Sequence, residues 1–172
     1  AMKKAVKQYA RDPFRQDVWD TLAAGMRYVG TEFDDEEGED RVGRVLEEID
    51  YLAGLEALDV GKPLTQARAD VVALARYLEF YGGAADKLHG QTLPYIDGHF
   101  AATEHVPHGV TAHIIPWNYP AQMFPRSVGP ALAVGNAVVM KPAEDACLTP
   151  LRITELMAEA GFPEGAMNIV TG

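Results

Sequence analysis

The fold class is decided by residues 110–142, whose sequence is VTAHIIPWNYPAQMFPRSVGPALAVGNAVVMKP. Residues 110–115 have the apolar, β-branched composition of a strand, which Pro116 ends. The uninterrupted apolar run 137–140 is typical of a strand that is covered on both faces. Between these strands, residues 121–133 predict a helix that is kinked or begins late, because it contains two prolines.

A second crossover follows in the sequence. Thr149-Pro150 predicts the capping residue and the first-turn proline of a helix over residues 151–160, and residues 167–170 predict a third strand. Strands and helices that alternate in such short succession indicate a parallel sheet with right-handed crossovers. The predicted class is therefore α/β, with a partial Rossmann-like parallel sheet, an N-terminal helical segment and a protruding β-hairpin.

Upstream of the sheet, apolar residues recur at helical spacing. One amphipathic helix is expected to end near Asp59-Val60-Gly61-Lys62-Pro63. A second helix, capped by Thr65, is expected to be interrupted at Gly82-Gly83 and followed by a short helical piece through Leu88.

Short β-prone runs flank Asp97-Gly98 within residues 91–105, and an Asp-Gly pair in that setting predicts a hairpin turn. A two-stranded ribbon is marginal in water by itself, so this one needs a surface to pack on. The pattern fits a contact with another subunit and a contact with the ribbon's own domain equally well. The chain thus divides into a helical segment at 1–90, a hairpin at 91–109 and a βαβαβ unit at 110–172.

Composition excludes several classes of partner. The net charge of -10 would repel phosphate backbones, so no nucleic acid is expected to bind. No apolar run approaches the ~20 residues that span a bilayer, and the N-terminus lacks a signal-peptide core, so we expect a cytoplasmic protein without membrane contact. Residues 1–30 have weak helical periodicity, and the acidic run 32–40 should be an exposed loop. The histidines have no recognised metal-binding spacing, so no metal is predicted.

Ligands of open parallel sheets bind just beyond the carboxyl ends of the strands. Three loops have that position here: Pro116-Trp117-Asn118, Lys141-Pro142-Ala143-Glu144 and Thr171-Gly172. A carboxylate such as Glu144 can accept hydrogen bonds from both hydroxyls of a ribose, and Lys141 can donate to the same sugar. Glu144 would also repel a 2′-phosphate, which favours NAD over NADP. From spacing alone, Lys141 and Glu144 could equally form an exposed charged turn.

Motifs along the last two thirds of the chain resemble those of the NAD(P)-dependent aldehyde dehydrogenase superfamily, whereas residues 1–40 match it poorly. The segments that carry the resemblance are Leu55–Leu64, Tyr81–Gly90, Pro107–Val110, Ile114–Pro120, Gly129–Ala133, Gly135-Asn136, Lys141–Glu144 and Ala160–Pro163.

The resemblance implies that Asn118 is the oxyanion residue, whose side-chain amide donates to the aldehyde oxygen during thiolate attack. From the residues alone, an Asn at this position could instead cap the following helix. The implied cofactor-binding residues are Ile115, Pro116 and Trp117 on the nicotinamide side, and Lys141, Ala143, Glu144 and Gly172 on the adenosine side.

The implied reaction oxidises an aldehyde to a carboxylic acid with NAD as hydride acceptor, through a cysteine thiolate and a glutamate base. We expect both catalytic residues to lie beyond Gly172, because Cys147 has no counterpart as a nucleophile and fits a small packing residue better. The chain would then be the N-terminal part of such an enzyme, inactive alone, with its hairpin serving as the oligomerisation ribbon of a dimer or tetramer. The alternative is a non-catalytic remnant that binds nucleotide or assembles with a complete subunit.

Overall fold

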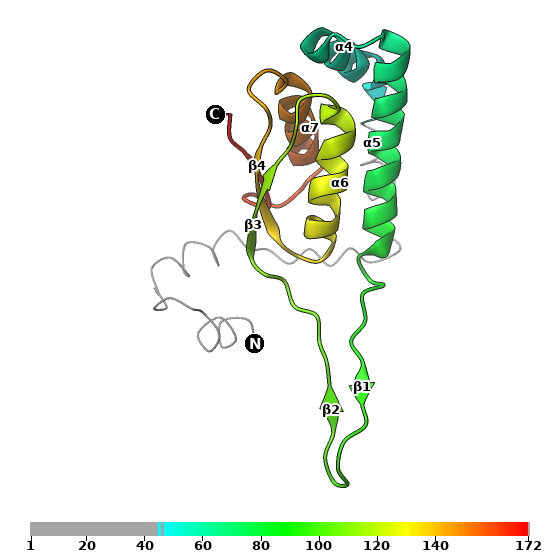
Figure 1. Cartoon of the computed structure of the whole chain (residues 1–172), viewed down its shortest axis with the longest axis vertical. Helices are drawn as coiled ribbons and strands as arrows, with labels where there is room; N and C mark the ends of the chain where they lie inside the picture. Colours follow the sequence, from blue (N-terminus) through cyan, green and yellow to red (C-terminus); the bar gives the residue numbers. More distant parts are fainter. Residues whose placement is uncertain (1–44, 46, 172) are drawn as a thin grey trace.

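The computed structural model describes residues 45 and 47–171 (Figure 1). The expectations for residues 1–30, for the acidic run 32–40 and for Gly172 lie outside the described residues. In chain order, the elements are α4 (Ile49–Val60), α5 (Leu64–Ala84), β1 (Thr92–Leu93), β2 (Ala101–Ala102), β3 (Val110–Ile114), α6 (Pro120–Ala133), β4 (Ala137–Lys141), α7 (Leu148–Glu159) and β5 (Met167–Ile169).

The three strands β3, β4 and β5 form a parallel sheet in that order, with the helices α6 and α7 as the crossovers. Val110 pairs with Ala137 and Ile114 with Lys141, so β3 and β4 end side by side. The ladder reaches one residue further, because the Ile115 amide donates to the Lys141 carbonyl at 3.1 Å. The predicted α/β class with a Rossmann-like parallel sheet is confirmed.

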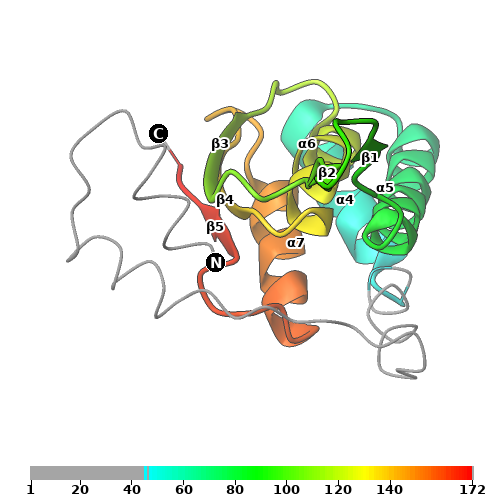
Figure 2. The ribbon, with the colours of Figure 1, turned by 90° about the horizontal axis from the view of Figure 1, so that it is seen from below.

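The body of the molecule has three layers, in which α6 and α7 lie between the sheet and the pair α4 and α5 (Figure 2). Apolar side chains from all three layers are fully buried together and form one core. The largest of them are Phe124, Leu52, Leu74, Met140 and Ile153. Alternate residues of β4 supply the contribution of the sheet to this core.

The two faces of the sheet differ in how well the described residues cover them. Val138 and Met140 are buried beneath the helices, whereas Ala137 and Val139 on the other face are only half-buried. Ile114 on that second face is 81% exposed. The expectation that the run 137–140 is covered on both faces is therefore met on one face only within residues 47–171.

The helix α5 extends further than the sequence predicts. It begins at Leu64, directly after Pro63 and without a side-chain cap from Thr65, and it continues through Gly82-Gly83 to Ala84. No helical piece follows through Leu88. Each glycine in a helix costs about 1 kcal/mol relative to alanine, but packing against α6 offsets this cost, and local propensity is overruled.

The helix α6 is continuous from Pro120 to Ala133, although it contains Pro125 and Pro130. It therefore does not begin late, and Pro120 lies in its first turn, where the missing N–H is not needed. Its inner face buries Phe124 and Val128 completely, and this burial favours the helix despite its prolines.

The predicted hairpin is present as an arm, residues 91–109, that projects away from the body (Figure 1). Its strands are antiparallel and two residues long, with Thr92 opposite Ala102. The turn at its tip has Asp97-Gly98 in the middle, closed by the His99 amide donating to the Ile96 carbonyl at 3.2 Å. Only Gly98 takes a positive φ, of 80°, so Asp97 does not need the left-handed conformation that the pattern allows.

None of the helices in the described part of the chain is long and apolar enough to cross a membrane.

Candidate functional site

Two loops meet at the carboxyl edge of the sheet, one after β3 and one after β4. The first, residues 115–119, begins at the buried Ile115 and then exposes Pro116, Trp117 and Asn118. Trp117 is 60% exposed, which is unusual for so large an apolar side chain. The structure thus brings six of the seven predicted site residues within the described chain to this one edge, with Ile115 buried beneath them.

The side chain of Asn118 is exposed and makes no hydrogen bond to any residue that the structure describes. Tyr119 occupies the N-cap position of α6, and its side chain makes no capping hydrogen bond. The capping role that the residues alone allowed for Asn118 is therefore not adopted. The side-chain amide has two N–H donors and one acceptor oxygen. It belongs to a loop whose two ends are fixed by β3 and α6.

The second loop, residues 142–147, carries an ion pair. The Lys141 ammonium donates to a Glu144 carboxylate oxygen at 2.7 Å and to the Pro142 carbonyl at 3.3 Å. The hydrogen bond from Lys141 lowers the pKa of the exposed Glu144 below its ordinary value, with help from a backbone hydrogen bond. Ala143, half-buried between them, accepts from the Ala146 amide at 3.1 Å and so closes the turn. The Glu144 carboxylate, an acceptor, and the Lys141 ammonium, a donor, are thus held side by side in this turn.

A buried polar cluster behind the first loop escaped the sequence analysis. Glu56 and Asp70 are fully buried, and the Lys62 ammonium lies 2.8 Å from an oxygen of each. Burial of the ammonium opposes its charge, but hydrogen bonds to Asp70 and Glu56 raise the pKa of Lys62 above its ordinary value. Lys62 also lies over the ring of Tyr119, 4.4 Å from its centroid. In the sequence, Lys62 belonged to a helix-breaking run and to the motif segment Leu55–Leu64, and neither indicated a buried cluster.

The second loop is fixed from α4 as well. The helix α7 begins at Leu148, three residues before the predicted start, and Thr149-Pro150 lies inside its first turn rather than capping it. The Leu148 amide instead donates to Asp59 at 2.8 Å. The Thr149 hydroxyl is buried without a hydrogen-bond partner within the described chain. A cap supplied from 89 residues away leaves no local signal in the sequence.

Cys147 is half-buried and immediately precedes α7, without a side-chain capping bond. This position agrees with a packing residue.

His113 is a residue of β3, and its ring contacts α6. One ring nitrogen is 2.8 Å from the Ser127 hydroxyl and the other is 2.9 Å from the Thr111 hydroxyl. Burial lowers its pKa below the ordinary value. Within the described residues, no three His, Cys, Asp or Glu side chains gather in a way that could hold a metal ion.

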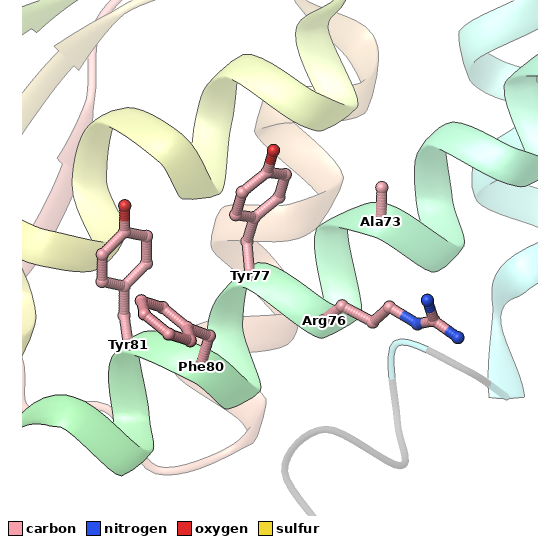
Figure 3. A pocket seen from close by; sticks show the side chains of 5 residues that line it. All are labelled: Ala73, Arg76, Tyr77, Phe80 and Tyr81. Carbon is pink, nitrogen blue, oxygen red and sulfur yellow. The ribbon is translucent and has the colours of Figure 1, made fainter.

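An open groove of about 410 Å³ runs along α5 beside α6 (Figure 3). It is lined by Ala73, Arg76, Tyr77, Phe80 and Tyr81, and the two tyrosine rings point toward α6. The guanidinium of Arg126 on α6 lies 5.9 Å from the Tyr77 ring. The groove is aromatic and apolar, and it flanks the helix that follows Asn118.

Comparison with known proteins places these features in context. The sequence model of the aldehyde dehydrogenase family matches residues 40–172. Hydroxyisobutyraldehyde dehydrogenase of Mycolicibacterium austroafricanum is 49% identical over 128 residues, which are 74% of this chain and 25% of that protein. The chain spans about a quarter of the length of the curated relatives it matches.

Solved structures agree with the sequence comparison. Indole-3-acetaldehyde dehydrogenase of P. syringae, solved in complex with NAD⁺, has a TM-score of 0.74 at 39% identity, covering 77% of this chain and 27% of that one. The aldehyde dehydrogenase KauB of Pseudomonas aeruginosa has a TM-score of 0.81 at 34% identity, covering 89% of this chain and 31% of that one.

Proposed function

The chain belongs to the aldehyde dehydrogenase family, and on that premise we propose that it supplies the nucleotide-binding segment of an enzyme that oxidises an aldehyde to a carboxylic acid with NAD. The observation that carries the proposal is the meeting of two loops at the carboxyl edge of the sheet. One loop offers Trp117 and the Asn118 amide, which has no hydrogen-bond partner among the described residues, and the other offers Lys141 and Glu144.

In this proposal the first loop faces the reacting centre. Pro116 and Trp117 line the nicotinamide half of the cleft above the buried Ile115, which supports them from below. Asn118 donates its side-chain N–H to the aldehyde oxygen, and the bond strengthens as negative charge develops there. The Asn118 amide suits this role because it has no competing hydrogen-bond partner among the described residues. The nucleotide, when bound, supplies the hydride acceptor.

The second loop would hold the adenosine ribose. Glu144 accepts from the ribose hydroxyls, and Lys141 donates to the same sugar. Ala143 and Gly172 complete the adenosine side. Glu144, like any exposed glutamate, is charged at neutral pH, and that charge would repel the 2′-phosphate of NADP. Two points therefore favour NAD: the exposed carboxylate here and the NAD⁺ bound to the P. syringae relative.

The nucleophilic thiolate and the general base are, in this proposal, contributed by sequence outside these 172 residues. Cys147 immediately precedes α7, in the loop that carries Glu144, whereas Asn118 belongs to the other loop. These 172 residues alone would then bind nucleotide without turning over an aldehyde. The cytoplasmic location stays a prediction, as do the expectations that nucleic acid, membranes and metals are not bound.

The arm supports a further part of the proposal, a contact between subunits of a dimer or tetramer. Among the described strands, its two strands pair with each other and with no third, and its large apolar side chains are exposed. These exposed residues are Leu93, Tyr95, Ile96, Phe100 and Val106. A second subunit would bury them, which explains why so short a ribbon keeps so many.

The first test is Asn118→Ala in the full native polypeptide, with NADH formation measured at saturating NAD⁺ and aldehyde. Loss of one oxyanion donor should lower turnover on the order of 10²-fold. The melting temperature should stay unchanged, because the amide holds nothing in place within the described chain. An unaltered turnover would remove Asn118 from the chemistry.

The second test is Glu144→Gln, with dissociation constants measured for NAD⁺ and NADP⁺ by calorimetry. Binding of NAD⁺ should weaken by about tenfold through loss of charged hydrogen bonds, and the preference over NADP⁺ should narrow. The matched control is Asp145→Asn, an exposed carboxylate next along the chain. Equal constants in wild type and Glu144→Gln would place the ribose elsewhere.

A further inference from the structure

The helix α4 presents two carboxylates, one turn apart, to the starts of two other helices. A Glu56 oxygen accepts from the Ala121 amide in the first turn of α6 at 3.2 Å. An Asp59 oxygen accepts from the Leu148 amide, the first residue of α7, at 2.8 Å. Residues three apart lie on the same face of a helix, so a single surface of α4 reaches both sites. Amides at helix starts have no partner within their own helix, which makes each of these bonds a tertiary cap.

Both capped helices directly follow a loop of the proposed nucleotide site. Ala121 is three residues after Asn118, and Leu148 is four residues after Glu144. The other end of each loop is fixed by the paired strands β3 and β4. A shift of either helix start relative to the sheet must therefore be taken up by the loop itself.

The contact at Glu56 is rigid because it belongs to the buried cluster. Lys62 bridges Glu56 and Asp70, and its ammonium covers the ring of Tyr119, the residue after Asn118. Asp70 in turn accepts from the Gln122 side chain at 2.7 Å, which ties a second residue of the first turn of α6. Both oxygens of Glu56 face donors, so a carboxylate is needed there, and an amide could satisfy only one of them.

The contact at Asp59 involves fewer hydrogen bonds than the contact at Glu56. Asp59 is half-buried and accepts one hydrogen bond among the described residues, for which one oxygen is enough. A second link holds α7 to α4, because Arg152 on α7 donates to Glu48, the residue that precedes α4, at 2.9 Å. The helix α7 is thus held near both ends of α4.

We propose that α4 sets the separation between the two loops of the nucleotide site, with Glu56 and Asp59 as its positioning residues. The inference rests on the proposed function for the identity of the site. Glu56 acts on the loop of Asn118, and Asp59 acts on the loop of Glu144. Neither touches the substrate or the nucleotide.

The direct experiment is hydrogen–deuterium exchange on the full native polypeptide without ligand. Glu56→Gln should speed exchange of the amides in 117–123 about tenfold and leave those in 143–150 within about twofold. Asp59→Ala should speed exchange of the amides in 143–150 about tenfold and leave those in 117–123 within about twofold. Asp59→Asn keeps an acceptor oxygen and should have a smaller effect than Asp59→Ala. The matched control is Asp50→Asn, an exposed α4 carboxylate that pairs with Arg68 and should alter neither segment.

Kinetics give the second readout. Glu56→Gln should lower turnover about tenfold with the NAD⁺ dissociation constant within about twofold of wild type, because the shifted loop carries Asn118. Asp59→Ala should raise the NAD⁺ dissociation constant about threefold to tenfold with turnover retained, since it frees the ribose loop. A purely structural role would move both quantities together, in step with the melting temperature.

Equal changes in both segments for both variants, or no change in either, would overturn the positioning role. If Glu56→Gln does not fold, the exchange rates of the amides in 143–150 are compared between Asp59→Ala and Asp59→Asn. Equal rates in these two variants would also overturn the positioning role. A wild-type protein that neither binds NAD⁺ nor oxidises aldehydes would refute the proposed function instead, and the exchange data would still report on the two contacts.

Discussion

The body and the arm of this molecule differ in how far their apolar side chains are exposed to solvent. In the body, Phe124 and Leu74 are fully buried by packing of helices on the sheet. In the arm, Phe100 is 81% exposed, and the two strands share a ladder of only two residue pairs. The body therefore draws its stability from a buried core, whereas the arm is held by its turn, its short ladder and the hydrogen bonds between Gln91 and Thr103. The difference indicates that the arm is completed by contact with another surface.

The strongest test of this contrast is Phe124→Ala in the body. Removing a fully buried phenylalanine should cost about 3–5 kcal/mol of unfolding free energy, through lost transfer energy and the cavity left behind. Urea unfolding followed by circular dichroism measures it. A loss of unfolding free energy below about 1 kcal/mol would show that the core around α6 is poorly packed and differs less from the arm than its burial indicates.

Close packing of α5 on α6 offers a sharper test with a matched control. A Cβ added at Gly129 would lie 2.6 Å from Cδ2 of Tyr81, so Gly129→Ala should cost about 1–3 kcal/mol. A Cβ at Gly54 on α4 meets nothing within 4 Å, and Gly54→Ala should therefore stabilise the protein slightly, as alanine favours helices. The two melting temperatures should move in opposite directions. Similar shifts would mean that Tyr81 simply moves aside.

The pH dependence of stability should report on His113. Because burial lowers its pKa in the folded state, the unfolded chain binds a proton more readily as pH falls through the ordinary value near 6.5. The stability linked to His113 is thus fully present above that value and is lost as pH falls below it. Denaturant titrations at pH 7.5 and 5.5 should show a smaller difference in His113→Gln than in wild type. An identical difference would assign the loss to other groups.

The smallest effect on folding is expected in the arm. The double change Tyr95→Ser and Phe100→Ser should alter the unfolding free energy of the monomer by no more than about 0.5 kcal/mol, since both side chains are exposed. The same change should lower the association state seen by sedimentation velocity. An oligomer of unchanged size would show that the arm packs elsewhere, and the subunit contact proposed for it would fail.

Much of the sheet was predictable because its signals are local. The strand β3 was placed within one residue, and β4 and β5 began at the predicted residues, since a short apolar run bounded by glycine or proline has few other solutions. The loops at the carboxyl edge follow from the parallel topology, and the family follows from motifs spread along the last two thirds of the chain. The individual roles of Asn118, Lys141 and Glu144 stay predictions.

Helix starts and polar contacts were predicted less well. The sequence offered Thr65 and Thr149 as caps, but neither serves, and the starts of α6 and α7 are capped by Glu56 and Asp59 from 65 and 89 residues away. The order of elements, the parallel sheet and the residues at its edge can be inferred from the amino-acid sequence, because hydrophobic periodicity and turn chemistry act between near neighbours. The contacts that hold that edge in shape are visible in the folded chain alone, because a capping bond depends on where two atoms meet in space, and separation along the chain carries no record of that distance.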